Sequence, residues 1–413
     1  MSIKAKSAQK VKRNKKKIFK KIFIILAIVA AVITLLAFVA NLILFKLNMN
    51  RVKEYSAVVN HDAVKPVLDE NGEYVFETDR ELKILTLTDI HIGGGWISFN
   101  KDRKALNAVA AMVAAEKPDL VVLTGDLAYP VPVQSGTFNN KTSAKLVISL
   151  MEQLQVPWTV TFGNHDTEAY SYFNRKKIGK LYADESLKYC LFSEGPEDVD
   201  GVGNHVIHVK NSDGMLVQEL VFMDSHSYTD GDIFGIFWKY DNIHNNQVDW
   251  YEKKILAAQE NNPNVKSLVF IHIPLVEYRD AYNEYLENGE ADTENVRYVS
   301  GYMCEKDPFV YCGMGEDNLF EKMIELGSTQ AVFCGHDHEN NMVLNYKGID
   351  LTYNNSVDYL AYVGISKRGD HRGCTVVTVN PDGTYTQVHE SYYQDKYEPL
   401  YPKEEVSYEH SHK

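Results

Sequence analysis

Side chains with oxygen and nitrogen donor atoms recur at five places between residues 89 and 338. The five patterns are Asp-x-His, Gly-Asp, Gly-Asn-His-Asp, a lone His and Gly-His-x-His. Carboxylate, carboxamide and imidazole groups bind divalent ions, and this mixture suits Mn, Fe or Zn better than Mg or Ca. Seven donors are enough for two ions if one carboxylate bridges them. The seven candidates are Asp89, His91, Asp126, Asn164, His272, His336 and His338.

Each of these patterns directly follows an apolar, β-rich run, which predicts that a strand positions it. The expected strands are residues 82–88, 120–124, 158–162, 267–271 and 331–334, with others at 218–223 and 375–379. Helical patterns alternate with them at 102–115, 144–153, 247–259 and 319–326. This order predicts a partly parallel sheet covered by helices, in which ligands bind beyond the carboxyl ends of the strands. Since alternate residues of extended chain share a side, Asp89 and His91 should grip one ion, and His336 and His338 should share a side too.

In this order, the five patterns resemble the signature of calcineurin-like metallophosphoesterases over about residues 82–340. Three stretches, at residues 162–168, 272–278 and 333–338, resemble the purple acid phosphatase-related branch. The resemblance implies a four-layer α/β/β/α sandwich. It also implies hydrolysis of phosphomonoesters or phosphodiesters by a hydroxide that bridges two divalent metal ions.

The resemblance also implies a role for each residue. His165 would contact the substrate phosphate or the leaving-group oxygen and act as general acid, and Asp166 would orient His165 and raise its basicity. Asp126 would bridge the two ions. The first ion would be held by Asp89, His91 and His338, and the second by Asn164, His272 and His336.

Tyr129 marks a departure from the family pattern. Purple acid phosphatases lack the histidine of the first pattern and take a tyrosine ligand from Gly-Asp-x-x-Tyr. This chain has both His91 and Tyr129. We predict that His91 is the ligand and that Tyr129 packs beside or behind the ligands.

Two further residues are candidates for substrate binding. Arg175 follows the third pattern and could contact a phosphate, or form an ordinary salt bridge. His226 follows a predicted strand and could line the pocket, or be a plain loop histidine. Cys304 and Cys312 could pair if the domain lies outside the cytoplasm.

The N-terminal region predicts a membrane anchor. Residues 22–45 form an apolar run interrupted only by Thr34 and Asn41, and a helix of that length, roughly 36 Å, spans the hydrocarbon core of a bilayer. A cleaved signal peptide is the alternative, but its apolar region would be shorter. Residues 1–21 carry ten Lys and Arg and no acid, which predicts a cytoplasmic tail and an extracytoplasmic body anchored in the cell membrane.

Composition limits what the body can bind. The chain is 45% hydrophobic with a formal net charge of -13, and the charge beyond residue 21 is -23. A body this acidic predicts no nucleic-acid-binding patch.

We expect a segment at 46–80 that is a stalk or an entry strand, a phosphoesterase domain at 81–395 and a tail at 396–413. A pyrophosphatase, a phospholipid-headgroup hydrolase and a catalytically silent scaffold remain alternatives.

Overall fold

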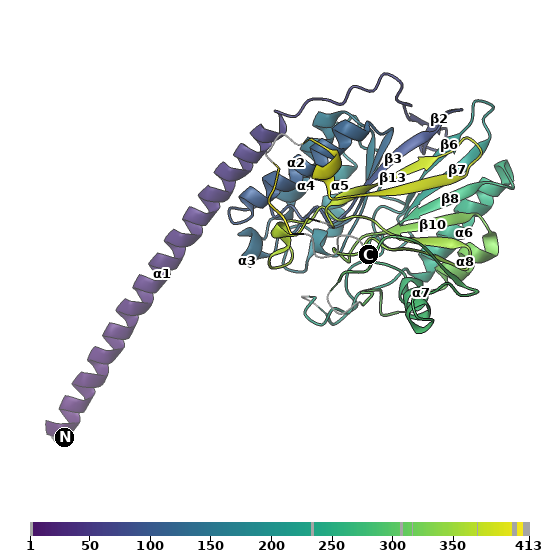
Figure 1. Ribbon diagram of the computed structural model, residues 1–413. Coiled ribbons are helices and arrows are strands. Elements are labelled where there is room, and N and C mark those ends of the chain that lie inside the picture. The colour runs from purple at the N-terminus through teal and green to yellow at the C-terminus, as the bar shows by residue number, and fades with distance from the viewer. Residues whose placement is uncertain are drawn as a thin grey trace.

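The computed structural model describes residues 3–232, 235–305, 309–315, 317–369, 371–398 and 403–407, with side chains from residue 15 onward. A long helix, α1 (Ile3–Val52), precedes an α/β body (Figure 1). Part of the predicted tail at 396–413 lies outside the described residues.

Within the described part of the chain, the strands form two mixed sheets. The smaller sheet has the order β14-β13-β3-β4-β5, in which β3, β4 and β5 are parallel and β13 is antiparallel to β3. Its strands are β3 (Leu82–Leu87), β4 (Leu120–Thr124), β5 (Trp158–Thr161), β13 (Gly373–Val379) and β14 (Tyr385–Ser391).

The larger sheet has the order β1-β2-β6-β7-β8-β10-β12-β11-β9, with β7, β8, β10 and β12 parallel. Its strands are β1 (Val67–Leu68), β2 (Tyr74–Glu77), β6 (His205–Lys210), β7 (Leu216–Phe222), β8 (Lys266–Phe270), β9 (Val296–Ser300), β10 (Thr329–Cys334), β11 (Val343–Tyr346) and β12 (Ile349–Tyr353). All seven predicted strands are present, with ends shifted by up to two residues.

Helices cover the outer face of each sheet (Figure 1). The smaller sheet packs against α2 (Phe99–Glu116), α4 (Asn140–Leu154) and α5 (Arg175–Tyr182). The larger sheet packs against α6 (Asn245–Asn261), α7 (Val276–Glu287) and α8 (Leu319–Leu326). The short helices are α3 (Pro132–Ser135), η1 (His165–Thr167), η2 (Ile365–Lys367) and α9 (Tyr393–Lys396).

The alternation of side chains along each strand builds three apolar cores. In β4, Val121 and Leu123 pack against the helices, whereas Leu120 and Val122 face the other sheet. In β8, Phe270 likewise packs in the core between the two sheets. Strands buried on both faces read as continuous apolar runs, as these do. The layers therefore run helix, sheet, sheet, helix, which confirms the predicted four-layer fold.

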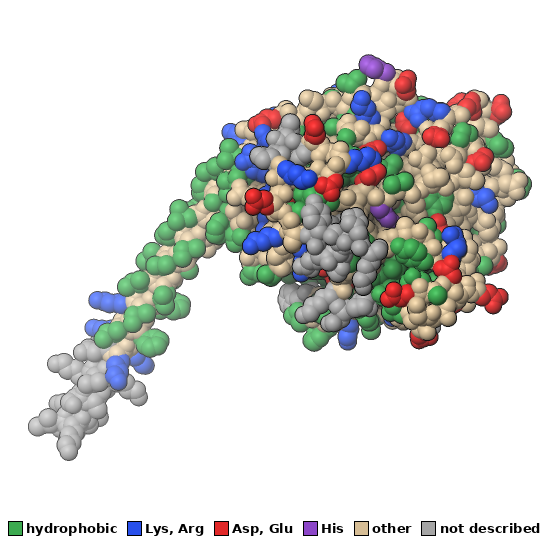
Figure 2. All heavy atoms as spheres, in the orientation of Figure 1, with side chains coloured by type: hydrophobic (Ala, Val, Ile, Leu, Met, Phe, Trp, Pro, Cys, Tyr) green, Lys and Arg blue, Asp and Glu red, His purple; other side chains and the backbone are tan. Residues whose placement is uncertain are grey.

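The N-terminal helix has two distinct parts. From residue 15 to residue 36 every side chain is exposed, and Figure 2 shows hydrophobic side chains around the helix, with Lys near its beginning. The last turns pack against α2 and α4, where Val52 is buried in the core of the smaller sheet. Among the described residues, α1 is long and apolar enough to cross a membrane, and it contains the predicted anchor at 22–45.

The segment at 46–80 is mainly part of the body. Residues 46–52 complete α1, and Tyr55 is buried beside Val52. Strand β2 then pairs in parallel with β6 at the edge of the larger sheet. Val75 and Phe76 are buried, which fits the entry-strand interpretation for this part of the segment.

Candidate metal centre

The seven predicted donors meet where the carboxyl ends of the two sheets face each other. Asp89 and His91 follow β3, Asp126 follows β4, and Asn164 follows β5. From the larger sheet, His272 follows β8, and His336 and His338 follow β10. All seven side chains belong to buried residues. The structure thus gathers groups that are separated by almost 250 residues in the sequence.

The donors fall into two groups that share Asp126. In the first group, donor atoms of Asp89, His91, Asp126 and His338 all lie within 4.8 Å of one another, and in the second those of Asp126, His272 and His336 do. The Oδ2 atom of Asp126 lies 3.4 Å from His91 Nε2 and 3.2 Å from His272 Nε2. Asn164 joins the second group, since its Oδ1 lies 3.2 Å from His272 Nε2.

Unsatisfied atoms in these groups fit bound cations. Asp89 Oδ1 and both ring nitrogens of His336 are buried and have no hydrogen-bond partner among the described residues. Burial, with a further contribution from His272, holds the pKa of His336 well below its usual range, so its ring is neutral and offers a lone pair. Buried polar atoms without partners are rare in native proteins unless a ligand satisfies them. The donor set therefore fits two divalent ions.

The other charged groups of the centre are strongly coupled. Burial raises the pKa of the Asp126 carboxyl, but His272, His165 and His91 outweigh it and leave that pKa well below the usual range. Burial lowers the pKa of His272, and Asp126 raises it to about 9. Asp126 is therefore an anion at neutral pH, as a bridging ligand must be.

Four of the donors have a left-handed backbone conformation. The φ angles are +50° at Asp89, +49° at His91, +52° at Asp126 and +79° at His336. Our expectation that Asp89 and His91 share a side because the chain is extended is therefore wrong, although the two side chains do meet. Left-handed conformations at residues other than glycine cost energy and cluster at functional sites.

Two motif glycines are required by close approach between loops. A Cβ atom on Gly163 would lie 2.1 Å from Asp126 Oδ1, and one on Gly335 would lie 2.0 Å from Thr88 Oγ1. The loop after β5 thus passes directly over Asp126, and the loop after β10 passes directly over the end of β3. Glycine lets the backbone of each loop reach the donors of the neighbouring strand.

Asp358 is a residue of the centre that we did not predict. Its Oδ1 lies 3.2 Å from His91 Nδ1, and its Oδ2 lies 3.2 Å from His338 Nδ1. One buried carboxylate thus faces the outer nitrogens of two donors and leaves their Nε2 atoms toward the first group. Asp358 follows β12 and the polar run Asn354-Asn355-Ser356. The rule that polar residues follow strand ends would have found it, had β12 been predicted.

His165 is oriented by Glu168 rather than by Asp166, which corrects our prediction. His165 Nδ1 lies 2.6 Å from Glu168 Oε1. Residues 165–167 form a 3₁₀ turn, in which side chains three positions apart line up. Burial lowers the pKa of His165, but Asp126 and Glu168 raise it above the usual value. The side chain of His165 is 22% exposed, whereas that of Glu168 is 2% exposed.

Asp166 instead holds backbone together beneath the centre. Its carboxylate accepts hydrogen bonds from the backbone N–H groups of Gly163, Asp126 and Ala128, at 2.8, 3.0 and 2.9 Å. Burial and the charge of Asp126 raise the pKa of Asp166 to about 6. Asp166 therefore ties the loop after β4 to the loop after β5, a structural task rather than a task at His165.

Tyr129 lies against the ligands, and its hydroxyl bonds elsewhere. Its ring stands edge-on to His91 and to His165, with centroid distances of 4.9 and 4.7 Å. The hydroxyl donates to Gln134 Oε1 at 3.2 Å, and burial raises its pKa above the usual value. A neutral phenol that donates to an amide fits the predicted packing role.

Arg175 and His226 are both engaged by other protein groups. The Arg175 guanidinium pairs with Asp224 and donates to the carbonyl oxygens of Gly163 and His226. His226 Nε2 lies 2.8 Å from Gln247 Oε1. These contacts fit the salt-bridge interpretation of Arg175 and the loop interpretation of His226, and substrate binding by either residue stays a prediction.

Three tyrosines flank the donors. The Tyr228 hydroxyl lies 3.0 Å from Asn164 Nδ2, the Tyr240 ring stands edge-on to His336, and the Tyr362 ring stacks on His338 at 4.5 Å. They come from the loops after β7 and β12. No motif pointed to them, because their positions depend on how these loops fold over the centre.

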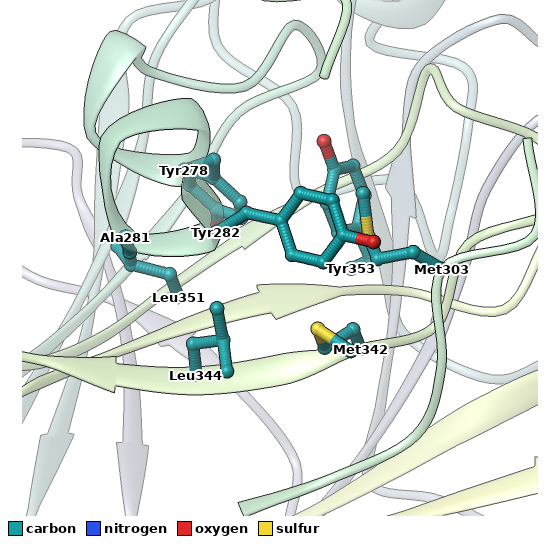
Figure 3. Close-up of a pocket in the computed structure, with 8 residues that line it drawn as sticks. All are labelled: Tyr278, Ala281, Tyr282, Met303, Met342, Leu344, Leu351 and Tyr353. Carbon is teal, nitrogen blue, oxygen red and sulfur yellow. The ribbon is translucent and has the colours of Figure 1, made fainter. Parts of the chain in front are cut away.

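A small apolar cavity lies apart from the seven donors, between α7 and the larger sheet (Figure 3). Its volume is about 10 Å³, room for one water at most, so it is no substrate pocket. It is lined by Tyr278, Ala281, Tyr282, Met303, Met342, Leu344, Leu351 and Tyr353.

Cys312, which belongs to the same apolar core, is a buried free thiol, so the suggested pairing with Cys304 is wrong.

The chain is similar to several known proteins. A protein of Arabidopsis thaliana named "probable inactive purple acid phosphatase 14" is 29% identical over 324 residues, which cover 71% of this chain and 75% of that protein. Phosphatase DCR2 of Saccharomyces cerevisiae is 28% identical over 302 residues, 68% of this chain and 48% of that protein. A solved dimetal phosphatase from Danio rerio aligns with 76% of this chain and 100% of its own, at 13% identity and a TM-score of 0.44.

The family model for calcineurin-like phosphoesterases matches residues 82–340. That range begins at β3 and ends just after His338, so it contains all seven donors. The similarity to purple acid phosphatase relatives agrees with the branch that the sequence resembles. The chain belongs to the calcineurin-like phosphoesterase family.

Proposed function

We propose that this protein is a membrane-anchored, two-metal hydrolase of phosphate esters, either monoesters or diesters. The observation that carries the proposal is the pair of buried donor groups joined through Asp126. The family match adds the reaction class.

In this proposal the seven donors hold two divalent ions, and the donor chemistry favours Mn, Fe or Zn. Asp89, His91 and His338 would hold one ion, Asn164, His272 and His336 would hold the second, and Asp126 would be shared between them. When bound, the two ions lower the pKa of a coordinated water and neutralise the phosphoryl oxygens, which is the chemistry that ester hydrolysis requires.

His165 is the proposed general acid. Its Nδ1 is held by Glu168, which leaves Nε2 as the nitrogen available to a leaving-group oxygen. The neighbouring carboxylates raise its pKa and so favour the protonated ring. A proton from Nε2 would neutralise the leaving alkoxide as the ester bond breaks.

A catalytically silent scaffold is the competing proposal. It is favoured by the names of three Arabidopsis thaliana relatives, which call those proteins probable inactive purple acid phosphatases. Against it, every donor position that the resemblance predicts is filled in this chain and lies in one of the two groups. A scaffold has no need of such a complete set of donors.

The membrane part of the proposal rests on α1. Its exposed apolar stretch would cross the cell membrane, and the ten basic residues before it would remain in the cytoplasm. The phosphoesterase domain would then lie outside.

The first test is hydrolysis by the purified full chain in detergent. A chromogenic phosphomonoester and a phosphodiester would be assayed with Mn, Fe, Zn or Mg, and bound metal would be measured. We expect metal-dependent turnover that falls by about 10²-fold or more in His165→Ala and in Asp126→Asn, which loses the anionic bridge between the ions.

Two outcomes decide between the proposals. An exposed aspartate and an exposed histidine far from the centre give matched controls, Asp213→Asn and His61→Ala, which should keep wild-type turnover. Stoichiometric binding of two ions with no turnover on either ester would favour the scaffold. Turnover that persists in Asp126→Asn would refute the assigned centre.

A further inference from the structure

Five large side chains form an exposed apolar surface beside α1, which we call the loop patch. Its members lie in the loops after β3, β4 and β5, and Figure 1 shows α3, which carries one of them, on the side of the body that faces α1. Patches of this kind on a protein surface mark contacts with other proteins or with membranes. The members are Trp96, Ile97, Val133, Phe138 and Tyr172, with exposures of 47, 45, 81, 40 and 64%.

The loop patch is continuous with α1. Asn41 accepts a hydrogen bond from the Trp96 backbone N–H at 2.7 Å and donates to the Gly136 carbonyl at 3.1 Å. The Phe138 ring stacks on Tyr172, whose N–H donates to the Phe138 carbonyl at 3.1 Å. The polar Asn41 within an apolar helix is thus used to attach these loops to α1.

The position of Asn41 along α1 sets the level of the loop patch. Lys21 ends the basic tract, and Asn41 is twenty residues further on, or about 30 Å along a helix. The hydrocarbon core of a bilayer is also about 30 Å thick. If Lys21 marks one boundary of the core, Asn41 and the loops bound to it lie at the other boundary.

Side chains on the outer face of α1 agree with that level. Leu42 and Ile43 are each 55% exposed and Leu47 is 49% exposed, while Asn48 and Val52 face the body and are buried. Both α1 and the adjoining loops therefore present apolar groups to the same zone, where Trp and Tyr are favoured by their amphipathic rings.

We propose that the loop patch lies in the headgroup layer of the bilayer that α1 crosses, so that the domain rests on the membrane instead of hanging from a tether. This inference rests on the membrane anchor of the proposed function. Its consequence concerns the centre, because the three loops begin at donors or catalytic groups. Trp96 is five positions after His91, Val133 is seven positions after Asp126, and Tyr172 is seven positions after His165.

The test uses the full chain in phosphatidylcholine–phosphatidylglycerol vesicles. Single cysteines at Val133, Ile33 or Met215 would carry an environment-sensitive fluorophore in a Cys304→Ser background, since the other four cysteines are buried. Met215 is the matched control, an apolar residue that is 44% exposed and lies just before β7, at the opposite end of the sheets from the donors. Quenching by nitroxide-labelled lipids and by aqueous iodide would then be measured.

We expect the lipid quencher to act at least about threefold more strongly on the Val133 label than on the Met215 label. Val133 is 81% exposed, so the substitution spares the core, and a Tyr172→Cys label serves as a second probe of the same surface. The Ile33 label, in the middle of the apolar stretch, should be quenched most strongly.

The alternative outcomes separate this inference from the anchor. If the Ile33 label is quenched while Val133 and Tyr172 behave like Met215, the loop patch does not touch lipid and the anchor stands. If Ile33 also escapes the lipid quencher, the anchor fails and the inference fails with it. If the Val133 label is shielded from iodide but not reached by lipid, a protein contact covers the surface and the inference is wrong.

Discussion

At the residue scale, Asp358 is the clearest test of how the centre is held together. Its two oxygens face His91 Nδ1 and His338 Nδ1, and carboxylates in such positions keep ligand histidines aligned and basic. We expect Asp358→Asn to weaken metal binding about 10- to 100-fold. Competition with a fluorescent chelator would measure the affinity.

A control is needed, because Asp358 also accepts from the backbone N–H groups of Leu360 and Ala361. Asp350, on β12, is a matched case, a carboxylate that accepts hydrogen bonds from Tyr385 and Asn345 away from the donors. Asp350→Asn should leave the metal affinity unchanged. An Asp358→Asn protein with wild-type affinity would show that the alignment of the two rings does not depend on this carboxylate.

Glu168 gives a second residue-scale prediction, one that separates it from Asp166. Glu168 contacts His165 Nδ1 directly, and it reaches the metal donors only through the Tyr228 hydroxyl. Glu168→Gln should therefore lower turnover about 10- to 100-fold while both ions still bind. The loss should be greater for esters with poor leaving groups, which depend more on a proton donor. Steady-state kinetics on a series of aryl phosphates would measure it.

Asp166→Asn should behave differently. Asp166 binds three backbone N–H groups that position the loops after β4 and β5, so its loss should lower stability and metal content together. Equal losses for good and poor leaving groups in Glu168→Gln would contradict the general-acid role of His165.

At the element scale, a partly buried ion cluster joins Glu73, the residue before β2, to β6 and β7. His208 on β6 lies 3.0 Å from Glu73 and 2.6 Å from Glu219, its partner on β7. Burial lowers the pKa of His208, but the hydrogen bonds with Glu219 and Glu73 raise it from 6.5 to about 9. The charged imidazolium is therefore part of what holds the entry strand in the sheet.

The sign of the pH dependence follows from that shift. Because the pKa of His208 is higher in the folded than in the unfolded state, the protonated ring stabilises the fold. This stabilisation is fully present below pH 6.5, the pKa of the unfolded state, and is lost as pH rises through about 9. Between these values, wild type should lose about 1–2 kcal/mol more free energy of unfolding than His208→Gln. Urea unfolding at pH 6 and at pH 10 would measure the difference, and His61→Gln, an exposed histidine, should retain the wild-type slope.

At the scale of the whole molecule, α1 is both a candidate membrane span and part of the core. Val52 is 1% exposed within the cluster that joins α1 to α2 and α4. Val52→Asp would bury an unpaired carboxylate there, and we expect a loss of about 3 kcal/mol or more. Faster tryptic cleavage at Arg51 and Lys53 would report the release of α1 from the body.

Leu47→Asp is the matched control, because Leu47 lies on the same helix but is 49% exposed. It should leave the cleavage rate close to that of wild type. If Val52→Asp is cleaved no faster than Leu47→Asp, α1 is held to the body by other contacts, such as those of Asn41.

The sequence by itself predicted a sheet covered by helices, the candidate span and the seven candidate donors, whereas the four-layer arrangement was implied by the family resemblance. The first three follow from local signals: short β-rich apolar runs that alternate with helical patterns, one long apolar run, and polar motifs placed immediately after strand ends. The order of the motifs carried the family resemblance, which the family match confirms. Such signals survive in the sequence because each depends only on neighbouring residues.

Only the tertiary structure decided how the donors are supported. Glu168 rather than Asp166 meets His165, because a 3₁₀ turn follows β5. Asp358 reaches His91 from 267 positions away, and Asp89, His91, Asp126 and His336 adopt left-handed conformations directly after runs that read as extended strands. These features arise where two sheets and their loops pack together, so their energies depend on contacts between distant segments and leave no local pattern in the chain.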